Sequence, residues 1–152
     1  MPQPNNLPTD ELVHQIETEL SSLFRMARIH WKNAACEVHP ELQPIGYKIL
    51  SVMIKNNITS AATLGETLLA DKSVISRQIK TLKELELITC ELSSSDRRAR
   101  ILRPTEQAIV KVNQAQSNFR ARFHKVLSNW PLKDLENFSS LLSSFTDEIT
   151  KP

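Results

Sequence analysis

Apolar residues follow one another in steps of three or four along most of this chain, and this spacing limits the fold more than any other feature. In the first predicted helix the steps run through Leu12, Ile16, Leu20, Leu23, Ala27, Trp31 and Ala34. Such spacing gathers apolar side chains on one face of an amphipathic helix. Only two glycines occur in 152 residues, few for the many tight turns of a β-sandwich or barrel. The sequence therefore predicts a mostly helical protein.

The predicted helices are separated by capping and turn residues. They run from Thr9 to just before Pro40, from Pro44 to Asn57, from Thr59 or Ser60 to Leu68, from Asp71 to Leu85, from Thr105 to Val126 and, after a break at Trp130-Pro131, from Leu135 to Ile149. The third and fourth are joined by two or three residues only. A short helix, a tight turn and a second amphipathic helix form a helix-turn-helix candidate.

After Leu87 the period changes to two, which is typical of a half-buried strand. Ile88, Cys90 and Leu92 are expected to face inward, and residues 99–103 to form a second strand. The fold class predicted is thus mostly α with a small β-hairpin wing. We expect residues 1–8 to be a disordered tail, 42–104 to form a winged helix-turn-helix lobe, and 9–41 with 105–150 to form a dimerisation region. The long terminal helices carry more apolar surface than the small lobe can cover.

The charge distribution points to a polyanionic partner for the central segment. The whole chain has a net charge of +2, but residues 71–103 hold eight basic and five acidic residues. The exposed face predicted for the fourth helix combines basic and hydroxyl side chains, which suit the major groove of duplex DNA. These residues are Lys72, Ser73, Ser76, Arg77 and Lys80. An ordinary solvated face is the alternative.

The predicted tip of the hairpin strengthens the DNA interpretation. Arg97 and Arg98 stand side by side on a short loop, where they could enter a minor groove of focused negative potential. Asp96 would then orient one of these arginines through a charge-assisted pair. A polar turn with chance charges is the alternative.

The stretch LGETLLADKSVISRQIKTLKELELI, followed by SSDRRARILRPTEQ, resembles the MarR (multiple antibiotic resistance regulator) family of bacterial winged helix-turn-helix proteins. The resemblance in residues covers about 42–112. It implies a dimer that binds a pseudo-palindromic operator, with Lys72, Ser73, Ser76 and Arg77 on the recognition helix. It also implies that Arg98 enters the minor groove, that Asp96 braces it, and that Arg97 fills a variable position.

The chain departs from the family pattern in three places that concern backbone geometry. Glu86 stands where a glycine usually closes the recognition helix, Pro104 replaces a leucine, and Ala108 replaces a glycine. The resemblance also implies an inducer pocket between the dimer region and the lobe. We expect it near His30 and Trp31 of the first helix and Tyr47 of the second, an aromatic pair beside a polar group.

Other chemistries find little support. His30, Cys36 and His39 lie close together without an obvious fourth ligand, so no metal site and no cofactor are expected. Motifs of nucleotide-binding enzymes, zinc proteases and serine hydrolases are absent, which argues against an enzyme. The N-terminus lacks the features of a secretory signal and no membrane span is expected, so the cytoplasm is the expected compartment.

Together these patterns predict a homodimeric, sequence-specific DNA-binding regulator, a repressor released by a small-molecule effector. Two alternatives stay open. One is a redox- or metal-responsive regulator of the same fold, for which Cys36 is the candidate thiol. The other is a helical interaction module that does not bind DNA, because a fold does not fix a function.

Overall fold

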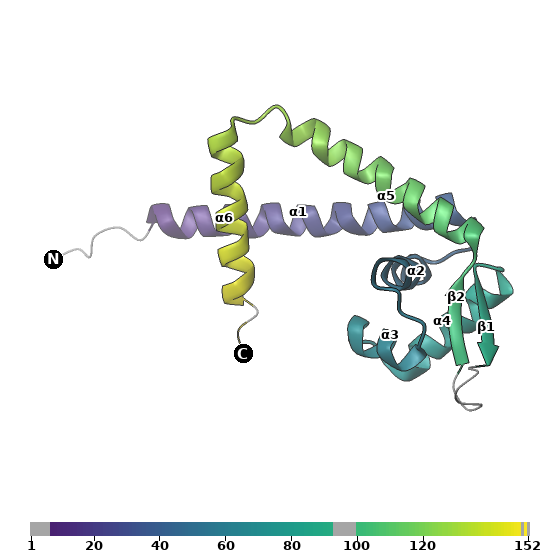
Figure 1. The fold of residues 1–152 in the computed structure, drawn as a ribbon. Coiled ribbons are helices and arrows are strands. Elements are labelled where there is room, and N and C mark those ends of the chain that lie inside the picture. Colours follow the sequence, from purple (N-terminus) through teal and green to yellow (C-terminus); the bar gives the residue numbers. More distant parts are fainter. Residues whose placement is uncertain (1–6, 93–99, 150, 152) are drawn as a thin grey trace. The chain divides into compact units, whose positions relative to one another are not determined.

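The structure, a computed structural model, describes residues 7–92, 100–149 and 151. Its elements are α1 (Leu7–Val38), α2 (Pro44–Asn56), α3 (Ala61–Leu68), α4 (Lys72–Glu84), β1 (Ile88–Leu92), β2 (Arg100–Pro104), α5 (Glu106–Leu127) and α6 (Leu132–Ile149) (Figure 1). The expected order of helices and hairpin is confirmed. α1 begins at Leu7, two residues before the predicted start at Thr9. Residues 1–6 of the predicted tail lie outside the described residues. The chain divides into two compact units, Met1–Ala115 and Gln116–Pro152, with the boundary inside α5.

The first unit is built around one apolar core. Its buried side chains come from the C-terminal end of α1, from α2, α3 and α4, from both strands, and from the first half of α5. They include Ala35, Val38, Ile49, Leu50, Met53, Leu64, Ile75, Leu82, Leu102 and Val112. Gly46 permits close packing in α2, because a Cβ atom there would stand 2.7 Å from the Leu42 side chain and 3.6 Å from that of Leu82. The helix-turn-helix and the hairpin therefore share one core.

A side-chain bond joins α5 to the end of α1 within this unit. The Lys111 ammonium donates a 3.0 Å hydrogen bond to the carbonyl oxygen of Val38, the last residue of α1. The final carbonyls of a helix have no partner within the helix and carry partial negative charge. A cation is therefore well placed here, and it fixes the start of α5 beside the core.

Most of α1 lies outside this core. Ala34, Ala35 and Val38 are buried, whereas Ile16 and Phe24 are 54% and 68% exposed. An amphipathic helix with an uncovered apolar face lacks the packing from which most helical stability comes. The N-terminal part of α1 thus presents a surface that this protomer's core does not cover.

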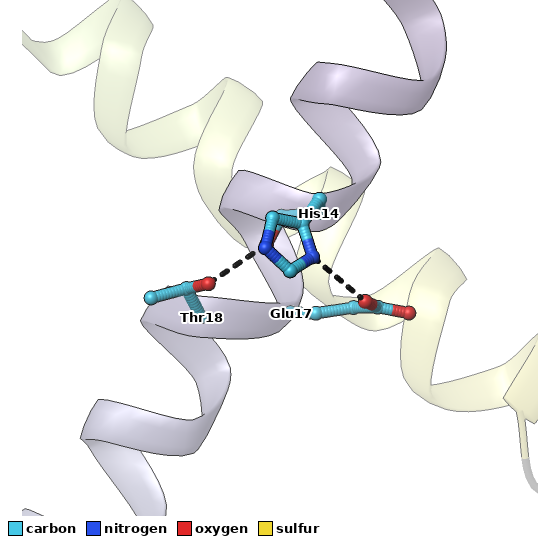
Figure 2. Close-up of polar contacts among 3 residues, drawn as sticks. All are labelled: His14, Glu17 and Thr18. Carbon is cyan, nitrogen blue, oxygen red and sulfur yellow. Dashed lines mark hydrogen bonds and ion pairs between the residues drawn. The ribbon is translucent and has the colours of Figure 1, made fainter.

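Short-range polar contacts occur on the exposed part of α1. Figure 2 shows Glu17 and Thr18 one turn away from His14. The Thr18 hydroxyl donates a 3.0 Å hydrogen bond to the carbonyl oxygen of His14, and the Glu17 carboxylate lies 3.7 Å from His14 Nδ1. These side chains are solvent-exposed, and such pairs contribute at most about 1 kcal/mol to the free energy of unfolding. They do not replace the packing that the apolar face lacks.

Three helices of the first unit end in the same way, with one residue in the left-handed region. Asn57, Leu69 and Glu86 have φ of 52°, 49° and 56° and follow α2, α3 and α4. The next amide in each case donates to a carbonyl five residues earlier: Ile58 to Met53, Ala70 to Gly65, and Leu87 to Leu82. This is the Schellman arrangement, whose left-handed position favours glycine or asparagine. Only Asn57 meets that preference.

The hairpin is antiparallel, with Ile88 opposite Pro104 and Leu92 opposite Arg100. Ile88 is buried and Cys90 half-buried, as the alternation predicts, but Leu92 is 68% exposed, which corrects its expected inward position. The reason is its place at the end of the hairpin where β1 leads into residues 93–99, and the facing Arg100 is exposed as well. The core reaches only the first part of β1.

The second unit holds the end of α5 and all of α6. Asp134 and Leu135 donate their amides to the carbonyl oxygen of Pro131, so the expected break at Trp130-Pro131 is where α6 begins. The Trp130 ring meets the Phe138 ring edge-on at a centroid distance of 5.5 Å. No described side chain of α6 is buried. Like α1, this unit leaves a large apolar surface uncovered.

Candidate nucleic-acid interface

The two faces of α4 have opposite chemistry. Ile75 and Leu82 are buried in the core of the first unit. The opposite face carries the five residues singled out in the sequence, and the structure exposes all of them: Lys72, Ser73, Ser76, Arg77 and Lys80. This arrangement follows from helical periodicity, because the apolar positions 75 and 82 fix which side of the helix faces the core. The exposed face therefore offers cations and hydroxyl groups on a rigid support.

The cations of this face are largely uncompensated. Lys80 lies 3.8 Å from the Glu84 carboxylate, one turn further along the helix. Lys72 and Arg77 take part in no ion pair with the described residues. Arg103 of β2 lies 3.9 Å from the Glu91 carboxylate of β1. The first half of α4 therefore offers two cations without an ion-pair partner among the described residues.

The N-terminus of α4 adds amide donors to these side chains. Asp71 precedes the helix in an extended conformation, and its carboxylate makes no capping hydrogen bond. Its carbonyl oxygen instead accepts from the amides of Val74 and Ile75, at 3.0 Å and 3.1 Å. The start of a helix carries partial positive charge and suits a phosphate group.

An open groove runs along α4 between α3 and the hairpin. Lys72, Ser76 and Lys80 line it from α4, Leu69 from the turn before α4, and Cys90 and Arg100 from the strands. Leu69 and Arg100 are not among the site residues predicted from the sequence. The sequence places Leu69 in the turn between the two helices and Arg100 in the second strand, but it does not indicate that either residue lines a groove. The groove joins the helix and the hairpin into one surface.

The hairpin is held in place against the helix-turn-helix by main-chain and side-chain bonds. The Leu102 amide donates to the Thr59 carbonyl oxygen at 2.8 Å. The Thr105 hydroxyl donates to the carbonyl oxygen of Glu86 at 3.2 Å and accepts from the Ala108 amide at 3.3 Å. The predicted wing is therefore present as a fixed strand pair. Asp96, Arg97 and Arg98 lie outside the described residues, and their roles stay predictions.

The three residues expected at an effector pocket lie in different environments. Tyr47 is buried in the core of the first unit. Trp31 is 37% exposed, and the Lys48 ammonium lies 5.4 Å from its ring centroid. His30 is half-buried. Burial raises the pKa of Tyr47 above 10.0, and the charge of Glu37 adds to the rise, because both disfavour the phenolate. None of the three lines the groove along α4, so their role stays a prediction.

The described residues show neither a membrane-spanning helix nor a metal-binding cluster. Within residues 7–92 and 100–149, no helix is both long and apolar enough to cross a membrane. No three histidine, cysteine or acidic side chains in the described part of the chain are grouped as a metal site would need. Cys36 is exposed and Cys90 half-buried, and both are free thiols.

Comparison with known proteins gives one consistent result. No protein-family model and no curated protein matches the sequence. Among solved structures, Streptococcus pneumoniae FabT in complex with DNA superposes with a TM-score of 0.81 at 14% identity, over 90% of this chain and 96% of that one. A MarR family transcription regulator gives 0.78 at 15% identity, over 93% and 92%. The fold is that of the MarR family. At these identities the likeness concerns the fold.

A third structure with the MarR fold contains a small molecule. The organohalide-sensing regulator RdhR in its 2,4-dichlorophenol-bound form gives a TM-score of 0.64 at 16% identity, over 96% of this chain and 86% of that one. The resemblance noted in residues 42–112 is thus confirmed by the fold, including the helices at both ends. In a winged helix of this type, α3 and α4 form the helix-turn-helix and the β1–β2 hairpin is the wing.

Proposed function

We propose that this protein is a homodimeric transcriptional regulator that binds a pseudo-palindromic DNA operator in the cytoplasm and has no catalytic activity. The observation that carries the proposal is the outer face of α4. Lys72, Ser73, Ser76, Arg77 and Lys80 are all exposed on it. Arginine and lysine can donate to guanine acceptors in the major groove, while serine can contact bases or phosphates.

The hairpin complements α4 in this proposal. Arg100 lines the same groove as Lys72 and Lys80, so cations of the helix and of the strands share one surface, which the carboxylates of Glu66, Asp71 and Glu84 line as well. Arg98 enters a minor groove and Asp96 orients it, in the roles that the resemblance implies. In this proposal the side chains of α4 contact base edges and set the sequence preference. The wing contributes mainly electrostatic attraction to the DNA.

Dimerisation is supported by the apolar surface that each unit leaves uncovered. On α1, Leu12, Ile16 and Leu23 are 59%, 54% and 54% exposed. On α6, Leu141 and Ile149 are 71% and 68% exposed. Apolar surface on this scale marks an interaction site, and most oligomers of soluble proteins are symmetric dimers. Residues 9–41 and 105–150 are accordingly proposed as the dimerisation region, and 42–104 as the DNA-binding lobe.

The proposed mode of action is repression that a small-molecule effector relieves. RdhR, which shares the fold, binds 2,4-dichlorophenol. In this chain the candidate effector residues are His30, Trp31 and Tyr47. A ligand that prefers the DNA-free conformation shifts the population away from the operator-bound state.

Selection of bound duplexes from a random pool tests the proposed function directly. The expected product has two related half-sites about one helical turn apart, the spacing at which two recognition helices meet successive major grooves. Binding should weaken steeply with salt concentration, because phosphate contacts release counterions. Enrichment of no sequence, together with no salt-dependent binding to random duplex, would contradict the proposal and favour an interaction module that does not bind DNA.

A further inference from the structure

Leu69, the C-cap residue of α3, has a solvent-exposed side chain. Leu69 is 95% exposed, more than any other large apolar side chain in the described residues. Its neighbours in sequence, Leu68 and Ala70, are half-buried and pack against the core. Leu69 itself therefore gains almost nothing from the hydrophobic effect within the protomer.

The backbone makes this leucine still less favourable for folding. Leu69 has φ 49° and ψ 43°, in the left-handed region. Its amide donates to Glu66 at 3.3 Å, and the following amide of Ala70 donates to Gly65 at 3.0 Å. Glycine or asparagine fits this position with less strain, as Asn57 does at the end of α2. Neither the turn nor the core of this protomer explains why a leucine stands here.

The position of Leu69 relative to the candidate interface supplies a reason. Leu69 lines the groove that Lys72, Ser76, Lys80 and Arg100 also line. It stands three residues before the start of the basic face of α4. A duplex that neutralises these cations would approach the methyl groups of Leu69 as well. In the major groove the apolar feature on the base edges is the C5-methyl group of thymine.

We propose that Leu69 is a specificity-determining residue that contacts the C5-methyl group of a thymine in each operator half-site. This inference rests on the proposed function. The contact excludes water from two apolar groups, and the left-handed backbone of the α3–α4 turn holds the side chain outward to make it. Strain at a surface residue is then part of the recognition geometry.

Replacement of thymine by deoxyuridine tests the proposal, because it removes the methyl group and leaves the base-pairing edge intact. In the selected operator each thymine of one half-site is replaced in turn, and the dissociation constant is measured for the full-length parent and for Leu69→Ala. At one thymine the parent should bind about fourfold more weakly without the methyl group, the factor that burial of one such group corresponds to. For Leu69→Ala the same replacement should have no effect, so the two changes are not additive.

Two further variants separate recognition from folding. Leu69→Met keeps an apolar side chain and should preserve the sensitivity to that thymine. Leu69→Gly relieves the left-handed strain, so it should melt at a higher temperature than the parent and still lose the sensitivity. Identical deoxyuridine profiles for the parent and Leu69→Ala would overturn the proposal while leaving DNA binding intact. Absence of any duplex binding by the parent would instead refute the proposed function, and the role of Leu69 with it.

Discussion

The amide of Leu102 donates a 2.8 Å hydrogen bond to the carbonyl oxygen of Thr59, which joins β2 to the segment between α2 and α3. Leu102 is also buried in the core, at 3% exposure. The hairpin is thus connected to the helix-turn-helix at a point distant in sequence. Its orientation relative to α4 is a property of the folded unit rather than of a free loop.

Truncation of this anchor should affect stability and DNA binding together. Leu102→Ala should lower the free energy of unfolding by about 2–5 kcal/mol, through lost burial and the cavity left behind. Operator affinity measured at a temperature where the variant is still folded should fall too, because the strands are less well fixed. Leu92→Ala is the matched control, since the same truncation at an exposed position of β1 should leave the melting temperature nearly unchanged. A fully stable Leu102→Ala protein would contradict the anchoring role.

Arg77 should contribute sequence preference as well as charge. Arg77→Ala should cost about 1–3 kcal/mol on the preferred operator and make the protein less selective between sequences. Lys55→Ala removes one exposed cation from the last turn of α2 and serves as the control. Titrations with preferred and random duplexes distinguish the two effects. Equal losses on both duplexes would show that Arg77 contacts phosphate only.

The left-handed Glu86 at the end of α4 offers a stabilising substitution. Glu86→Gly should raise the free energy of unfolding by up to about 1 kcal/mol, because glycine adopts positive φ without the Cβ penalty. Glu86→Ala removes the carboxylate but keeps the Cβ atom, so it should melt close to the parent. Thermal melts of the three proteins measure the difference. A Glu86→Ala protein as stable as Glu86→Gly would assign the effect to charge instead of backbone geometry.

Phe138 should be required for assembly. It is 45% exposed on α6 and meets the Trp130 ring. Phe138→Asp places a charge on the apolar surface and should give monomers or aggregates that do not bind operator DNA. Ser139→Asp introduces the same charge at the neighbouring exposed position and should remain dimeric. Sedimentation of the parent as a stable monomer at micromolar concentration would refute the proposed dimer.

Alkaline pH should destabilise the protein through Tyr47. The pKa of this buried phenol is raised above 10.0 in the folded state, chiefly by desolvation. Its contribution to stability is therefore fully present below pH 10, where the phenol is neutral in both states, and is lost as pH rises above that value. Tyr47→Phe should lose stability less steeply in this range. Because the chain has one tyrosine, phenolate absorbance reports this group alone.

The elements that the sequence predicts best are those with strong periodicity and clear capping residues. Pro44, Asn57 and Ser60 mark ends of helices in the structure as expected, and Ser60 accepts a 3.5 Å hydrogen bond from the Thr63 amide. The five residues on the outer face of α4 were predictable because Ile75 and Leu82 fix the inner face. Periodicity needs only local information, so it works well for helices such as these.

Features that depend on neighbours distant in sequence were less predictable. Alternation alone placed Leu92 inward, but burial depends on how far the core extends under β1. The left-handed turns at Leu69 and Glu86 carry residues that do not favour positive φ, so tertiary packing imposes them. Nor could spacing show that Leu69 and Arg100 line one groove, since that requires the hairpin to lie beside α4.

In the proposed dimer, the apolar face of α1 would make folding depend on protein concentration. A chain whose first helix packs fully only against a second copy has a folded population that rises with total protein concentration, by mass action. The melting temperature should therefore increase when the protein is concentrated, with no ligand added. In a cell, dilution below the dissociation constant would expose Leu12, Ile16 and Leu23 to proteases. The cellular concentration of the proposed regulator would then have a lower limit, set by the dissociation constant of the dimer. Below this limit, chains would be degraded before they could bind DNA.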